Sequence, residues 1–166
     1  MSITSPPGVL ERTGIPAASS RREVVAVILE YRGRIALLKR SQSVGHDRDR
    51  WHCITGYLEP GTTAAQQARV ELYEETGLGP NDISLLESRD RLSISDATGS
   101  PWLVHTFKAV TSRRRLSLNE EHVTYRWTHP AKVSRFSNRV DWLSLVLDAV
   151  FNQDAKTGKE AHGSGA

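Results

Sequence analysis

The hydrophobic pattern of the first third of the chain predicts strands. Residues 24–29 form an unbroken apolar run rich in β-branched side chains, which is typical of a strand buried on both faces. Residues 35–40 predict a second strand, and the turn at 31–34 between the two strands predicts a hairpin. A polar loop at 41–50 then leads to a short strand at 51–54.

The rest of the pattern adds strands and a C-terminal helix. Strands are expected at 83–91, 102–110 and 123–127. Residues 138–151 carry apolar side chains at helical spacing, which predicts a helix that packs one broad face on the sheet. Because the strands and helices do not alternate regularly, we expect an α+β fold rather than a doubly wound one.

A further helix, at 63–75, has sequence signals at both ends. Thr63 followed by Gln66 is a capping-box pattern. Gly77 is suited to end the helix in the left-handed conformation. The expected buried stripe recurs every four residues and contains Ala64, Ala68 and Leu72.

Three glutamates lie in the last turn of this predicted helix. Glu71, Glu74 and Glu75 are spaced i, i+3 and i+4, which puts their side chains within about 5–6 Å of one another. Like charges at that spacing are unfavourable, and the helix dipole disfavours anions in this turn by roughly 0.3–1 kcal/mol each. No Lys or Arg follows one turn later. Taken alone the three acids could be a solvated acidic patch, but a divalent cation bound by their oxygens would relieve both penalties.

The segment 56–78, GYLEPGTTAAQQARVELYEETGL, resembles the Nudix box. That pattern is Gly, five residues, Glu, seven residues, Arg-Glu, an aliphatic, any residue, Glu-Glu, any residue, Gly and an aliphatic. The resemblance extends over about residues 22–150 and implies a mixed sheet packed between helices, an α/β/α sandwich. The positions that match in register are Gly56, Glu71, Leu72, Glu74, Glu75, Gly77 and Leu78.

Two positions depart from the pattern. Thr62 stands where the family has its first Glu, which helps to shape the loop before the helix, and Val70 stands where the family has an Arg that braces a glutamate. Arg69 projects about 100° away around the helix and is a poor substitute. The departures leave two readings open: an enzyme with weakened support for its metal ligands, or a sensor module that binds a nucleotide or nucleotide sugar without cleaving it.

The resemblance implies a hydrolase that cuts the diphosphate linkage of a nucleoside diphosphate joined to another group, as in a nucleotide sugar or a nucleoside triphosphate. Water would attack phosphorus with the help of Mg²⁺ or Mn²⁺. Glu71, Glu74 and Glu75 are the expected metal ligands. Glu75, Glu120 and Glu121 are the candidates for the group that takes the proton, and Glu74 is included in the catalytic set.

The expected substrate contacts surround the loop at 41–50. Arginine side chains grip phosphate oxygens in a bidentate way, which makes the three arginines near this loop candidates. Trp51 could stack on a base, although an aromatic residue on a strand is more often part of a core. The expected substrate-binding set is Arg40, Arg48, Arg50, Trp51 and Gly56.

Composition sets the wider frame. The 166 residues, 38% hydrophobic and 25% charged, fit one folded unit. We expect a disordered arm at 1–20, the Nudix domain at 21–152 and a flexible tail at 153–166.

Charge and cysteine content limit the partners. A net charge of +3 suits an anionic small molecule and is too small to indicate nucleic acid. No apolar stretch is long enough for a bilayer, so no membrane partner is expected. Cys53 is the only cysteine, which fits the cytoplasm, and a homodimer would be common for the resembling family.

The metal assignment predicts that Glu74→Gln reduces turnover by orders of magnitude while circular dichroism shows an unchanged fold. Wild-type rates in this variant would refute the assignment of Glu74.

Overall fold

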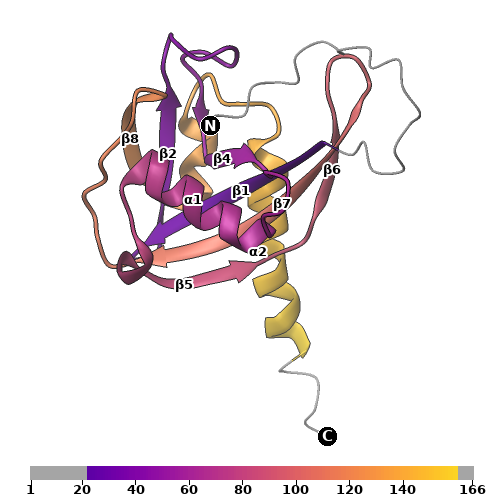
Figure 1. The fold of residues 1–166 in the computed structure, drawn as a ribbon. Coiled ribbons are helices and arrows are strands. Elements are labelled where there is room, and N and C mark those ends of the chain that lie inside the picture. The colour runs from indigo at the N-terminus through magenta and orange to yellow at the C-terminus, as the bar shows by residue number, and fades with distance from the viewer. Residues whose placement is uncertain (1–21, 161–166) are drawn as a thin grey trace, which may run out of the picture.

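A computed structural model describes residues 22–160, with side chains through Asn152 (Figure 1). Its elements, in chain order, are β1 (Arg22–Tyr31), β2 (Arg34–Arg40), β3 (Trp51–His52), β4 (Ile54–Tyr57), α1 (Ala64–Thr76), η1 (Pro80–Asp82), β5 (Ile83–Ser88), β6 (Leu92–Ser95), β7 (Pro101–Thr111), β8 (His122–Thr128), η2 (Pro130–Arg135) and α2 (Leu143–Glu160).

One mixed sheet organises the molecule around β1. The strand order is β3-β2-β1-β7-β5, with β4 paired to β1, β6 to β7 and β8 to β2. β1 and β7 run parallel, while the other pairs are antiparallel. The predicted hairpin is present, with Glu30 opposite Ile35.

Alternate side chains of β1 pack into two separate hydrophobic cores, because successive residues of a strand point to opposite faces of the sheet. Val25 and Val27 pack with Leu72 of α1 in one core. Ala26 and Ile28 pack with the apolar face of α2 in the other. The sheet therefore lies between α1 and α2, as Figure 1 shows, and the expected α+β fold with its α/β/α layering is confirmed.

Three details differ from the prediction. The strand expected at 51–54 is divided at Cys53 into β3 and β4, which pair with β2 and β1. β6 was not anticipated because it is four residues long and half exposed. α2 begins at Leu143, not at 138, because Asn138 adopts a left-handed φ of 59° and its carbonyl accepts the Trp51 backbone N–H at 3.0 Å.

The predicted domain limits are only partly addressed by the structure. α2 continues to Glu160, beyond the boundary expected at residue 152, so the segment 153–160 of the predicted flexible tail is helical in its backbone. The expected arm at 1–20 and the last residues, 161–166, lie outside the described part. Among the described helices, none is long and apolar enough to cross a membrane.

The packing of α1 predicts a contrast between neighbours. Leu72 is 1% exposed in the α1 core and Tyr73 is 65% exposed. Leu72→Ala should lower the free energy of unfolding by about 2–5 kcal/mol. Tyr73→Ala should change it by about 0.5 kcal/mol or less. Urea titration of both variants measures this, and equal losses would contradict the packing of α1.

Candidate active site

The two ends of α1 determine which of its side chains meet the sheet. The Thr63 hydroxyl accepts the Gln66 backbone N–H at 3.2 Å, and the Gln66 side chain accepts the Thr63 N–H at 3.0 Å. At the other end Gly77 has a left-handed φ of 74° and its N–H bonds to the Tyr73 carbonyl at 2.9 Å. Both predicted caps are confirmed, and the helix turns Glu71 and Glu75 toward the sheet, where both are buried.

Gly56 allows Glu71 to lie directly on β4. Glu71 is 1% exposed, and a Cβ at position 56 would overlap its carboxylate. The glycine is therefore required by close approach of the side chain, not by a special backbone conformation. Its expected role in substrate binding stays a prediction.

The closest group of possible metal ligands joins α1 to the start of β8. One ligand atom from each of Glu75, Glu121 and His122 lies within 4.8 Å of the others. Glu75 is 0% and His122 5% exposed. The His122 Nε2 and Glu75 Oε1 atoms are 3.6 Å apart, too far for a hydrogen bond.

Glu75 is a buried carboxylate of α1. Neither of its oxygens has a hydrogen-bond partner among the described residues, and the same holds for His122 Nδ1. Buried polar groups are almost always paired, and an unpaired buried carboxylate is among the most unfavourable exceptions. A carboxylate in this state fits a divalent cation, which supplies the missing opposite charge.

Burial also controls protonation in this cluster. It raises the pKa of Glu75 well above its ordinary value, and the charges of Glu71 and Glu121 add to the shift. It raises the pKa of Glu71 to about 7, against a hydrogen bond from Gln67 that favours the ionised form. It lowers the pKa of His122 to about 4. His122 is thus neutral near pH 7, the state in which imidazole binds metals.

Glu74 and Glu120 lie outside this group. Both side chains are exposed, although the charge of Glu74 contributes to the raised pKa of Glu71. The structure therefore separates Glu74 from the buried pair Glu71 and Glu75, and its assignment as a ligand stays a prediction. Glu121 is half-buried and belongs to the cluster, whereas Glu120 does not.

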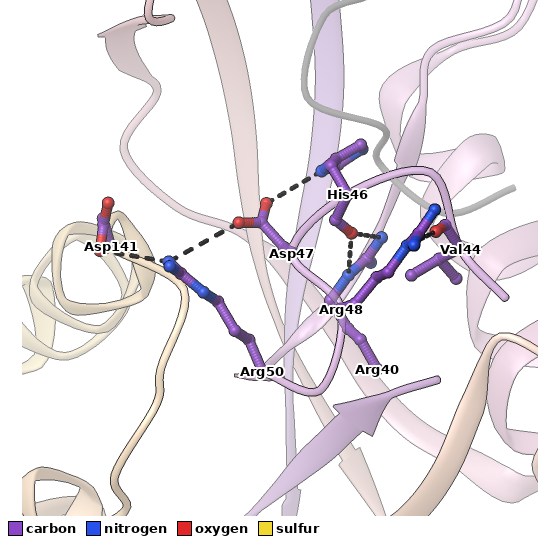
Figure 2. A network of polar contacts seen from close by, with 7 residues as sticks. All are labelled: Arg40, Val44, His46, Asp47, Arg48, Arg50 and Asp141. Atoms are coloured by element: carbon purple, nitrogen blue, oxygen red, sulfur yellow. Dashed lines mark hydrogen bonds and ion pairs between the residues drawn. The ribbon is translucent and has the colours of Figure 1, made fainter. Parts of the chain in front are cut away.

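Arg40 enters the site from the end of β2 and is buried, at 1% exposure. Its Nε and Nη2 atoms donate to the His46 carbonyl at 3.3 and 3.2 Å (Figure 2). Burial lowers the pKa of Arg40, while the charges of Asp47, Glu75 and Glu121 oppose that shift. Arg40 thus supplies positive charge near Glu75 and Glu121 and also binds the loop at 41–50 through the His46 carbonyl.

The other expected substrate arginines hold the same loop together (Figure 2). Arg48 Nε donates to the Val44 carbonyl at 2.8 Å. Arg50 Nη1 lies 3.7 Å from Asp47 and 3.5 Å from Asp141. These contacts stabilise the loop and link it to Asp141, and phosphate binding by either arginine stays a prediction.

Trp51 is engaged with the core on the α2 side of the sheet. Its ring meets that of Phe136 edge-on with centroids 5.1 Å apart. Base stacking by Trp51 stays a prediction.

Two side chains of the candidate site are absent from the set expected from the sequence. His122 was not among the expected ligands, and the pairing of β8 with β2 places it beside Glu75. Gln67 carried no motif signal, yet it bonds to Glu71. The Glu-Glu-His run before a predicted strand was the one available clue to His122.

Comparison with known proteins identifies the family of this chain. Residues 19–148 match the NUDIX domain family. The chain therefore belongs to the Nudix family, whose members are hydrolases that act on diphosphate bonds and generally use divalent metals.

Individual relatives are distant. The nucleoside triphosphatase NudI of Salmonella typhimurium is 26% identical over 127 residues, covering 72% of this chain and 90% of the relative. The MutT protein of Methanosarcina mazei Go1 has a TM-score of 0.66 at 19% identity, over 82% of this chain and 96% of that one. The NUDIX domain of Shewanella oneidensis NrtR, solved with ADP ribose, has a TM-score of 0.64 at 17% identity, over 83% and 88%. The two structures share the fold.

The buried acids predict an unusual pH dependence of stability without metal. The folded pKa of Glu71, about 7, lies above its ordinary 4.5, and that of Glu75 is also raised. Their contribution is therefore complete below about pH 4.5 and is lost as the pH rises through 7. His52 and His122, with pKa values lowered by burial to about 3 and 4, have the opposite effect, which is complete above about pH 6.5.

Between pH 6.5 and 8, Glu71 and Glu75 should dominate the pH dependence of stability. In EDTA the melting temperature should fall by several degrees over this window, and Mg²⁺ or Mn²⁺ should reverse the fall because metal binds the ionised carboxylates. Glu75→Gln should flatten the dependence. Differential scanning fluorimetry measures both, and a melting temperature that stays constant in EDTA would contradict the burial argument.

Proposed function

We propose that this protein is a metal-dependent diphosphohydrolase that cleaves a nucleotide at a diphosphate linkage. The observation that carries the proposal is the fully buried Glu75 carboxylate, whose two oxygens lack hydrogen bonds in the described structure while Glu121 and His122 converge on it. A hydrolase of this class uses a divalent cation to stabilise charge on the phosphoryl oxygens, and carboxylate oxygens are suitable ligands for that cation. Acids that formed only a solvated surface patch would be exposed, whereas Glu75 is 0% exposed.

Each residue has a role that follows from its position. Glu71, Glu75 and His122 would hold a divalent ion, with Glu121 at the edge of the cluster and Glu74 at the exposed rim. When bound, Mg²⁺ or Mn²⁺ neutralises charge that develops on the phosphoryl oxygens and makes water a better nucleophile. Glu121 is half-buried at the edge of the cluster and is our candidate for accepting the proton of that water. Arg40 would offset part of the negative charge of the cluster, which favours the approach of a phosphate.

Nucleoside triphosphates are the proposed substrates. The relative NudI is named as a nucleoside triphosphatase. The net charge of +3 on the whole chain favours the approach of such anions. We further expect the enzyme in the cytoplasm, where nucleoside triphosphates are abundant, and this stays a prediction.

A phosphate-release assay in Mg²⁺ and in Mn²⁺ tests the proposal. Nucleoside triphosphates are assayed with pyrophosphatase added, and nucleotide sugars and ADP-ribose with alkaline phosphatase, which releases phosphate from their monophosphate products. Glu121→Gln should lower kcat by about 10²–10⁴-fold, the usual contribution of a general base. Glu120→Gln is the matched control and should retain wild-type turnover because its side chain is exposed outside the cluster. Equal loss in both variants would refute the assignment of Glu121.

The second candidate function is a non-catalytic sensor. Thr62 and Val70 motivate it, because they replace two residues of the box, and the NUDIX domain of NrtR was solved with ADP ribose. Calorimetric binding of a nucleotide with no product from any substrate, in either metal, would favour the sensor. Turnover of any substrate that is lost in Glu75→Gln would exclude it.

A further inference from the structure

The hydrogen bond to Glu71 comes from a residue of α1 that is not one of the bracing positions of the box. The box position that would brace a glutamate holds Val70, and the position that would shape the preceding loop holds Thr62. Val70 is 43% exposed and apolar, so it gives Glu71 no hydrogen bond. Glu71 is nevertheless buried against Gly56, where a carboxylate needs a donor.

Gln67 lies one helical turn before Glu71 and is 4% exposed. Its Nε2 donates to Glu71 Oε1 at 3.0 Å. Its Oε1 accepts the backbone N–H of Glu59 at 3.2 Å. One side chain therefore ties a buried acid of the site to the loop between β4 and α1.

The chemistry of the partners fixes the orientation of this amide. A backbone N–H can only donate, and an ionised carboxylate can only accept. The bridging side chain must therefore present an acceptor to Glu59 and a donor to Glu71 at the same time. Glutamine does so at this length, whereas ionised glutamate and methionine cannot donate and lysine cannot accept.

The loop that Gln67 holds is itself a closed turn. The Glu59 carbonyl accepts the Thr62 N–H at 3.1 Å, and Thr63 then caps the helix. Fixing the Glu59 N–H thus fixes the turn that leads into α1, the element that carries Glu71 and Glu75.

We infer that Gln67 is the positioning residue of this metal site, taking over in one side chain the loop-shaping and glutamate-bracing tasks left open by Thr62 and Val70. The inference rests on the proposed function, because it concerns the residues that would hold the metal. It also accounts for a competent site in a chain whose box is incomplete. Gln67 acts through Glu71 and touches no substrate.

Gln67→Met keeps the length and most of the volume of the side chain while removing both bonds. Mn²⁺ affinity, measured by electron paramagnetic resonance of the free ion, should weaken about 10–100-fold, the usual effect of losing a partner of a metal ligand. At saturating Mn²⁺, kcat should remain below the wild-type value while KM changes less, since Glu71 stays misplaced. Gln67→Asn, which is too short to reach both partners, should behave alike and serves if the methionine variant does not fold.

Gln66→Met is the matched control from the next position of the same helix. Gln66 is exposed and bonds only to Thr63 within the described structure. This variant should lower the melting temperature, because the lost capping bond costs about 1 kcal/mol of stability. Its Mn²⁺ affinity should stay within about twofold of wild type, because Gln66 bonds to Thr63 and not to Glu71. The control separates weakening of the helix from displacement of Glu71.

The outcomes distinguish the inference from the function on which it rests. Wild-type protein that binds no Mn²⁺ and hydrolyses nothing would overturn both. Wild-type protein that binds and hydrolyses, together with folded Gln67→Met and Gln67→Asn variants of unchanged affinity and kcat, would overturn the role of Gln67 alone. Equal loss of affinity in Gln66→Met would also overturn it, because the effect would then belong to helix stability.

Discussion

The buried carboxylate of Glu75 is the constraint on which the site depends. A charged group without hydrogen bonds is strongly disfavoured in a protein interior, so it either takes up a proton or is compensated by opposite charge. Glu71 and Glu121 are close enough to make the ionised form still less favourable, and Arg40 offsets only part of this. The cluster is therefore stable without metal in its protonated form and suited to metal binding in its ionised form, which links metal binding to proton release.

The fold produces this situation through close packing of α1 on the sheet. Ala68 and Leu72 bury the helix in one core, and Gly56 leaves room for Glu71 on the neighbouring strand. The pairing of β8 with β2 brings His122 and Arg40 together, since they are partners in the register. Glu71 and Glu75 lie on α1, which packs on the sheet, and Glu121 directly precedes β8, a strand of that sheet.

Much of the fold was predictable from local signals. The caps at Thr63 and Gly77, the apolar run of β1 and the hairpin to β2 depend on neighbouring residues and were predicted correctly. The glutamate spacing on α1 was equally local, but which face of the helix becomes buried depends on the sheet. For that reason the prediction from sequence placed Glu74 with Glu71 and Glu75 as a metal ligand, whereas the side chain of Glu74 is exposed in the structure.

Contacts between segments that are distant in the chain could not be predicted from the sequence. His122 meets Glu75 only through the order of strands, and the arginines near the loop at 41–50 gave no sign that Asp47, Asp141 and backbone carbonyls would engage them. The bond of Gln67 to Glu71 has the i, i+4 spacing that is readable in sequence, but its importance depends on burial.

The most direct measurement is the position of a bound cation. A crystal soaked in Mn²⁺ and measured at the manganese absorption edge gives an anomalous difference map that locates the ion without reference to activity. The account predicts a peak within about 2.3 Å of a Glu75 oxygen, in the space bounded by Glu121 and His122. A well-occupied peak elsewhere, with Glu75 unliganded, would contradict it.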